Sequence, residues 1–241
     1  QDGLRPKEIR VQLYAGDQKL GKEVVLSADN KWTHTFEKLA EKANGQAIHY
    51  SVKEVDVPEG YTVTEESKEK GDVVLTNTHT PSTVDIPVTK IWVDNDNQDG
   101  LRPAKITVKL LANGGEVARK DITSETDWKE TFTGLPKFKD GKEIVYTLQE
   151  EKVENYSPSI DQESYTITNT HTPGKTTLSV TKQWDDANNQ DGLRPKSVKV
   201  QLYADGKKSG EVIELSAENK WTHTFADLDK NVKGKAITYT V

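Results

Sequence analysis

The sequence contains neither cysteine nor methionine among its 241 residues. Without cysteine, the chain can form no disulfide, no catalytic thiolate and no cysteine-ligated metal site. Long hydrophobic segments are also absent. Only 33% of the residues are hydrophobic, and no segment approaches the roughly 20 apolar residues of a membrane span. Because the first residues also lack the apolar stretch of a signal peptide, we expect no membrane insertion by this chain.

Basic clusters are missing as well. Lys and Arg number 33 against 39 Asp and Glu, which gives a net charge of −6, so the chain is a poor candidate for binding nucleic acid. The five His residues are scattered along the chain without the spacing of a zinc site. No Gly-x-Ser-x-Gly motif or phosphate-binding loop occurs. We therefore expect no metal, no cofactor and no enzyme of the ordinary kind.

The acidic segment at 94–100 could be a calcium-binding loop or a solvated turn. Aligned as an EF-hand loop that starts at Asn95, the run places Ile106 at the twelfth position, where such a loop needs Glu. The corresponding run of the third repeat has Ala187 at the first position. We therefore predict a solvated turn at this position.

A repeat organises the chain. The hexapeptide Gln-Asp-Gly-Leu-Arg-Pro begins at Gln1, Gln98 and Gln190. The spacings of 97 and 92 residues fit small β-sandwich modules and are too long for a solenoid repeat. The Thr-Pro dipeptides at 80–81 and 172–173 are natural boundaries, because proline ends strand pairing. We predict three modules, at residues 1–80, 81–172 and 173–241.

Only the middle module is expected to be complete, because the first module lacks the first strand and the third lacks the last strands. Segment 1–52 resembles 190–241 more closely than either resembles the middle copy, so two module types alternate. The tryptophans fall at equivalent repeat positions, which favours packing between strands over a carbohydrate-binding platform. These positions are Trp32, Trp128 and Trp221, and separately Trp92 and Trp184.

Secondary structure is predicted to be mostly β-strand. Short segments rich in β-branched and aromatic residues, such as Ile144–Leu148 and Tyr165–Asn169, are bounded by turn-forming residues. The exceptions are Glu37–Asn44 and its counterpart Ala226–Val232, where we predict one or two helical turns. About seven strands per module predict an all-β fold of tandem immunoglobulin-like sandwiches.

Three polar residues lie on strand faces that are otherwise apolar. They are Lys90, Glu150 and Asn169, each in line with hydrophobic residues two positions away. The apolar neighbours are Val84, Ile86, Val88 and Trp92 for Lys90, Ile144, Tyr146 and Leu148 for Glu150, and Tyr165 and Ile167 for Asn169. The partial copies in the other modules are Lys182, Glu54 and Asn77. The complete set is therefore expected to point into the middle module.

Two interpretations of this set remain open. At the rim of a sandwich, Lys90 and Glu150 would form an ordinary ion pair near water, which avoids the cost of burying charge. In an apolar interior, a neutral lysine amine is a nucleophile, and a protonated carboxyl group can polarise an amide and carry a proton to departing ammonia. The product would be an amide between Lys90 and Asn169. By the disulfide formula, closing a loop of ~80 residues would stabilise the module by on the order of 4–5 kcal/mol.

Four segments of the middle module carry a family resemblance, namely Val88–Trp92, Asp94–Pro103, Tyr146–Glu150 and Thr166–Thr170. They resemble the CnaB-type repeats in the B region of collagen-binding adhesins on Gram-positive cell walls. The resemblance implies a reverse immunoglobulin-like sandwich with a spontaneous Lys90–Asn169 isopeptide bond, promoted by Glu150. By position, Glu54 and Asn77 lack their lysine partner, and Lys182 lacks its Glu and Asn.

The resemblance also implies a structural role. We expect stalk or spacer repeats of a wall-anchored surface adhesin, extracellular, with the signal peptide and sorting signal outside this fragment. The expected partners are neighbouring repeats of the same chain, and host extracellular matrix is expected to be bound only through a separate adhesin region. In the alternative, the repeats themselves bind a host or cell-wall ligand. An enzyme is disfavoured, because no unrepeated insertion carries catalytic residues.

Overall fold

The computed structural model describes residues 2–68 and 71–241, so that Gln1 of the first hexapeptide lies outside the described residues. These two ranges contain β-strands, loops and a short 3₁₀ turn at Ser124–Thr126, but no α-helix and hence no helix that could span a membrane. Contacts divide the chain into two compact units, Gln1–Asp85 with Thr133–Val145, and Ile86–Phe132 with Tyr146–Val241. The predicted module bounds at 80 and 172 stay a prediction.

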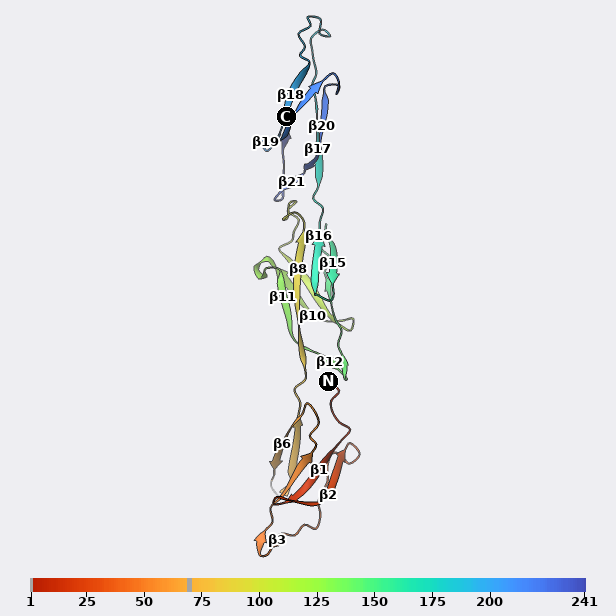
Figure 1. The fold of residues 1–241 in the computed structure, drawn as a ribbon, viewed down its shortest axis with the longest axis vertical. Coiled ribbons are helices and arrows are strands. Elements are labelled where there is room, and N and C mark those ends of the chain that lie inside the picture. Colours follow the sequence, from red (N-terminus) through yellow and green to blue (C-terminus); the bar gives the residue numbers. More distant parts are fainter. Residues whose placement is uncertain (1, 69–70) are drawn as a thin grey trace. The chain divides into compact units, whose positions relative to one another are not determined.

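The first module consists of hydrogen-bonded antiparallel strands (Figure 1). Its strands are β1 (Glu8–Ala15), β2 (Gln18–Ser27), β3 (Lys42–Ala43), β4 (Gln46–Ala47), β5 (Tyr50–Val55), β6 (Thr62–Ser67) and β7 (Val73–Thr78). They pair in the orders β2-β1-β5, β3-β4 and β6-β7. Val11 and Leu13 of the central strand β1 are buried, as expected for a strand that pairs on both sides.

The middle module is a sandwich of a four-stranded sheet, in the order β11-β8-β16-β15, and a three-stranded sheet, in the order β10-β9-β14. Its strands are β8 (Thr83–Val93), β9 (Lys105–Ala112), β10 (Gly115–Thr123), β11 (Lys129–Pro136), β14 (Tyr146–Glu150), β15 (Ser157–Asp161) and β16 (Thr166–Thr170), with a small hairpin of β12 (Phe138–Lys139) and β13 (Lys142–Glu143). The buried core comes from both sheets and comprises Ile86, Val88, Ile106, Val108, Leu110, Ile122, Phe132, Leu148 and Ile167. The predicted all-β sandwich is confirmed.

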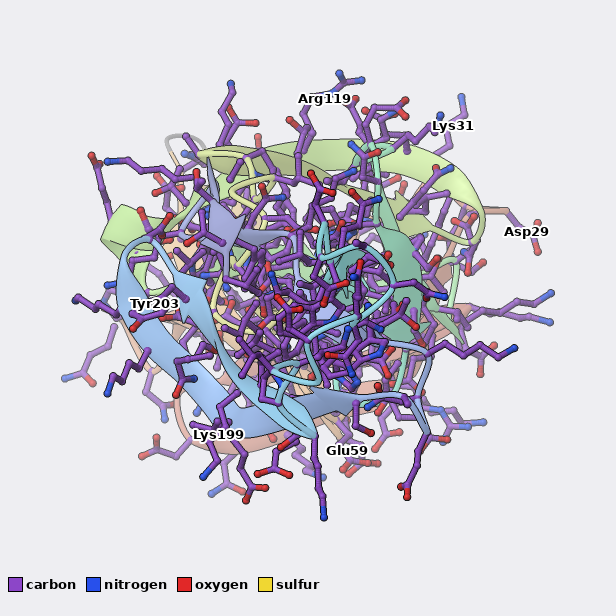
Figure 2. All side chains as sticks on the ribbon, turned by 90° about the horizontal axis from the view of Figure 1, so that it is seen from above. Asp29, Lys31, Glu59, Arg119, Lys199 and Tyr203 are labelled. Atoms are coloured by element: carbon purple, nitrogen blue, oxygen red, sulfur yellow. The ribbon has the colours of Figure 1, made fainter. Side chains whose placement is uncertain are left out.

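The third module repeats the same local pairings within the second compact unit. Its strands are β17 (Lys175–Thr181), β18 (Ser197–Ala204), β19 (Lys207–Ser216), β20 (Thr222–Asp229), β21 (Asn231–Val232), β22 (Lys235–Ala236) and β23 (Tyr239–Thr240). The pairing orders are β17-β20, β19-β18-β23 and β21-β22. Charged side chains such as Arg119 and Lys199 extend away from the strands (Figure 2), consistent with their exposure to solvent.

The predicted helical turns at Glu37–Asn44 and Ala226–Val232 are wrong. The second segment lies in strands β20 and β21, and the first has no helical residues. The backbone at Asp227 has a positive φ of 55°, and the β17-β20 pairing shifts its register between Thr176 and Leu178, opposite this position. Pairing with β17 through a β-bulge therefore overrides the local helical preference.

The acidic run after β8 is folded around a buried carboxylate, and the predicted solvated turn is wrong for Asp94, which is 2% exposed. Asp94 accepts two hydrogen bonds from Arg102, from Nε at 3.1 Å and from Nη2 at 2.7 Å. Tyr156 Oη donates to it at 2.8 Å and the Asn97 amide at 2.9 Å. Burial alone would raise the pKa of Asp94, but these donors lower it to about 2. Within the described ranges, no group of three or more His, Asp or Glu side chains is placed to hold a metal ion.

We predict that Asp94→Ala lowers the free energy of unfolding of the middle module by about 3 kcal/mol, because the Arg102 guanidinium loses its buried partner. The matched control is Asp186→Ala in the third module. Its carboxylate binds Arg194 in the same way, but its side chain is 29% exposed against 1% for Asp94, so we expect a loss of about 1 kcal/mol or less. Amide hydrogen exchange at Leu110 and at Leu202 in the full chain measures the two modules separately. Equal losses would contradict the assigned role of burial.

Candidate functional site

Three strands bring Lys90, Glu150 and Asn169 together inside the middle module. Lys90 lies on β8, which pairs in parallel with β16 so that Lys90 is opposite Ile167. Asn169 is two residues further along β16 and therefore shares the face of Lys90 as its diagonal neighbour. Glu150 ends β14 of the other sheet. The amine and the amide thus come from adjacent strands, and the carboxyl group faces them across the sandwich.

The Glu150 carboxyl group lies between the other two groups. Its Oε1 atom is 3.3 Å from Lys90 Nζ and accepts a hydrogen bond of 3.1 Å from Asn169 Nδ2. The Lys90 side chain is 0% exposed and that of Glu150 is 3% exposed, and Asn169 is also completely buried. The set therefore lies in the interior and not at a solvated rim.

Two polar atoms of this site lack hydrogen-bond partners among the described residues. They are Lys90 Nζ, whose contact with Glu150 is an ion pair, and Asn169 Oδ1. An unsatisfied buried polar group costs free energy, and native structures contain few of them. A site with an unsatisfied amine and an unsatisfied carbonyl oxygen on neighbouring strands needs a physical reason, such as a reaction between the two groups.

Burial changes the protonation of the lysine. Removal from water disfavours the ammonium form and lowers the pKa of Lys90 to about 8, although the nearby Glu150 carboxylate acts in the opposite direction. This shift increases the fraction of Lys90 side chains that carry a neutral amine near neutral pH. A neutral amine has the lone pair that a nucleophile needs. Burial therefore favours the neutral form of the Lys90 amine.

An aromatic and ionic layer, which the sequence pattern did not predict, covers the lysine. Lys90 Nζ lies 4.4 Å from the ring centre of Trp92, and Trp92 packs edge-on against Trp128 and Tyr156 at 5.1 and 4.9 Å. Arg102 lies on the same indole at 5.6 Å. The Asp94–Arg102–Tyr156 network therefore holds Trp92 over the amine and excludes water from it.

The sequence contained a signal for this layer. Asp94 and Arg102 are eight residues apart, and the same spacing separates Asp186 and Arg194 in the third module. The packing predicted for the tryptophans is found at Trp92 with Trp128 and at Trp184 with Trp221. Trp32, the equivalent residue of the first module, is exposed instead.

The partial copies of the site have the same local geometry. In the first module, Asn77 Nδ2 donates to Glu54 Oε1 at 2.9 Å, and Glu54 Oε2 and Asn77 Oδ1 are buried without a hydrogen-bond partner among the described residues. In the third module, Lys182 Nζ lies 4.4 Å from the ring centre of Trp184. The carboxyl–amide pair and the lysine–indole pair therefore each form without the rest of the set.

Comparisons with known proteins agree with this fold. The family model of the Cna protein B-type domain matches residues 1–78, 86–170 and 178–241. The chain is 48% identical over its whole length to a collagen adhesin of Staphylococcus aureus, of which it spans 20%. It is also 48% identical to the crystal structure of two B repeat units of the S. aureus collagen binding protein, with a TM-score of 0.66, and covers 64% of that chain. The chain therefore belongs to the Cna B-type domain family.

Proposed function

We propose that this chain is a stalk or spacer segment of an extracellular, cell-wall-anchored adhesin, and that its middle module is closed by an isopeptide bond between Lys90 and Asn169. The observation that carries this proposal is the buried arrangement of Lys90, Glu150 and Asn169, with the carboxyl group within 3.3 Å of the amine and 3.1 Å of the amide nitrogen. Family membership and the likeness to a staphylococcal collagen adhesin support the stalk role.

The proposed reaction needs no cofactor or oxidant. The neutral Lys90 Nζ attacks Asn169 Cγ, and the carboxylate of Glu150 takes one proton from Nζ. Glu150 then transfers a proton to Nδ2, the Cγ–Nδ2 bond breaks, and ammonia leaves. The amine loses one hydrogen to the departing ammonia, so that the products are a secondary amide and one ammonia molecule. Glu150 ends in the state in which it began, as a general acid–base group.

The proposed bond would lie where a stalk is loaded. We place the modules at 1–80, 81–172 and 173–241, so that tension enters the middle module through β8 and leaves through β16. Because these two strands are parallel neighbours, pulling on the start of one and the end of the other loads their hydrogen bonds in shear. A covalent bond between Lys90 and Asn169 would carry this load and shield residues 91–168.

The partners follow from this role. Neighbouring repeats of the same chain are the direct partners, and a host matrix ligand is left to a separate region of the whole protein. The middle module performs one self-catalysed reaction and does not turn over a substrate. In this proposal Glu54, Asn77 and Lys182 are equivalents of the reacting residues.

The first prediction of this proposal is that the folded chain is lighter than its sequence mass by one ammonia. Intact-mass spectrometry measures the loss, and peptide mapping should find one branched peptide that joins the segments of Lys90 and Asn169. The unmodified sequence mass from correctly folded protein would refute the covalent bond.

A second prediction assigns roles to the three side chains. Lys90→Ala and Asn169→Ala should abolish the ammonia loss, because each removes a reactant. Glu150→Gln keeps both reactants and nearly the same volume, and the reaction should stop or become much slower because a neutral amide cannot transfer the proton. The matched control is Glu151→Gln, which changes the exposed neighbouring carboxylate and should leave the loss complete. Full cross-linking in Glu150→Gln would exclude a proton-transfer role for Glu150.

A third prediction concerns force. In single-molecule pulling of the full chain, the middle module should give no extension from residues 91–168, whereas the Lys90→Ala chain should unfold at this module with a rate that rises under load. Equal extension of both chains would show that the bond, even if present, does not carry the load.

A further inference from the structure

The Gln-Asp-Gly start of the second hexapeptide takes no part in the Lys90 site. Asp99 contacts instead the segment that follows β16. Its Oδ2 atom accepts hydrogen bonds of 2.9 Å from both His171 Nε2 and the Gly174 amide, and its Oδ1 atom accepts one of 3.2 Å from Asn231 Nδ2 in the third module. The Asp99 side chain is only 8% exposed. One nearly buried carboxylate therefore joins the end of the middle module, the linker and the third module.

Gly100 makes a backbone contact at the same place. A Cβ atom on Gly100 would lie 2.4 Å from the Cα of Gly234, which is closer than side chains approach. Gly234 lies between β21 and β22, and its amide donates to Gln98 O at 3.0 Å. Gln98 Nε2 also donates to Asp229 Oδ1 at 2.9 Å. The β21–β22 hairpin is therefore packed directly on the backbone of the hexapeptide.

The first hexapeptide repeats the histidine, linker-amide and glycine contacts within the other compact unit, but among the described residues Asp2 Oδ1 has no donor that corresponds to Asn231. Asp2 Oδ2 contacts His79 Nε2 at 3.0 Å and accepts from the Ser82 amide at 2.9 Å. A Cβ atom on Gly3 would lie 2.6 Å from the Cα of Gly141, which lies between β12 and β13. The linker contact is repeated too, since Lys137 N donates to Ser82 O at 3.0 Å and Lys230 N to Gly174 O at 2.9 Å.

We infer that each Asp-Gly pair of the hexapeptide is a docking site between modules, and that its partner is the glycine hairpin of the adjoining Cna B-type module. We call this contact the Asp-Gly joint; it consists of Asp99, Gly100, His171 and Gly234, with Asn231 as an additional donor, or of Asp2, Gly3, His79 and Gly141 in the first repeat. In the third copy, a Cβ atom on Gly192 would meet nothing within 4 Å among the described residues.

His171 makes the joint sensitive to pH. Its Nδ1 faces the carbonyl oxygen of Asn155 at 2.9 Å and its Nε2 faces the Asp99 carboxylate. Two acceptors require two N–H donors, which only the imidazolium form provides. The groups around the ring are Asp99, Asp94, the Asn155 carbonyl and the Tyr156 ring. The hydrogen bond to Asp99 raises the pKa of His171, although burial opposes it. The raised pKa stabilises the joint fully below the ordinary histidine pKa, and this stabilisation is lost as the pH rises through the raised value.

The test measures how tightly the middle and third modules are held. The chain has no cysteine, so Glu125→Cys and Glu218→Cys, both at exposed positions, carry two spin labels without background. Double electron–electron resonance then gives the distribution of distances between them. We expect Gly100→Ala and Asp99→Ala to broaden this distribution. The matched controls are Gly192→Ala and Asp191→Ala, which should leave it unchanged.

The glycine pair separates docking from backbone strain. Gly100 and Gly192 have φ values of +71° and +68°, so alanine strains both backbones equally, and only Gly100 faces a hairpin. If the controls broaden the distribution as much as Gly100→Ala and Asp99→Ala, or if none of the four changes it, the joint is refuted. If Gly100→Ala perturbs the fold of the middle module, the comparison of Asp99→Ala with Asp191→Ala tests the joint in the same way.

The pH arm of the test uses the same labels. The distribution should broaden as the pH rises through the His171 pKa, which NMR titration of the ring measures in the same chain. A width that does not change with pH would exclude a role for the imidazolium. Because no residue of the joint belongs to the Lys90 site, we expect Lys90→Ala to leave the distribution of distances narrow. Failure of one proposal is therefore distinguishable from failure of the other.

Discussion

Burial of the Lys90 amine between two sheets is the constraint on which the middle module depends. Removing a cationic side chain fully from water costs free energy, which contacts with its surroundings must offset. The neighbouring elements provide these contacts. The facing sheet supplies the carboxyl group of Glu150 at 3.3 Å, and the indole of Trp92 covers the nitrogen at 4.4 Å. Asp94 and Arg102 in turn hold the indole in place. The loop after β8 thus positions the cover of an interior site, and burial lowers the pKa of the amine that this cover encloses.

Polar contacts in this chain have two different tasks. The interior set brings an amine, a carboxyl group and an amide into one site that is buried from solvent. The set at the hexapeptide consists of an aspartate, a histidine and closely packed glycines, and it forms contacts between successive modules within a compact unit. In our proposals, the first set determines the strength of a module, and the second determines the geometry with which modules follow one another.

Alternation along strands predicted the site better than its surroundings. Lys90, Glu150 and Asn169 were predicted to point inward because a strand has only two faces, and all three are buried. That β8 and β16 are parallel neighbours did not follow from the alternation, since pairing between distant strands leaves no mark in either strand; only the family resemblance brought Lys90 and Asn169 together. Ala226–Val232 was mispredicted because local composition does not reveal the β17 partner or the bulge at Asp227. In Glu37–Asn44 it does not reveal the pairing of Lys42–Ala43 with β4. Asp94 was expected to be solvated because its partner Arg102 lies at the far end of a loop. A loop has no regular alternation of side chains from which such a contact could be predicted.

The glycine contacts at the joints bear on how such a chain changes in length. Every repeat contains both halves of the contact, an Asp-Gly pair (2–3, 99–100 and 191–192) and a hairpin glycine (Gly45, Gly141 and Gly234). If whole repeats were duplicated or deleted in a gene, each new boundary between repeats would again place an Asp-Gly pair against a glycine hairpin. With the joint as proposed, the number of repeats can change without compensating substitutions, whereas a side chain at either glycine would block the boundary wherever that repeat is copied.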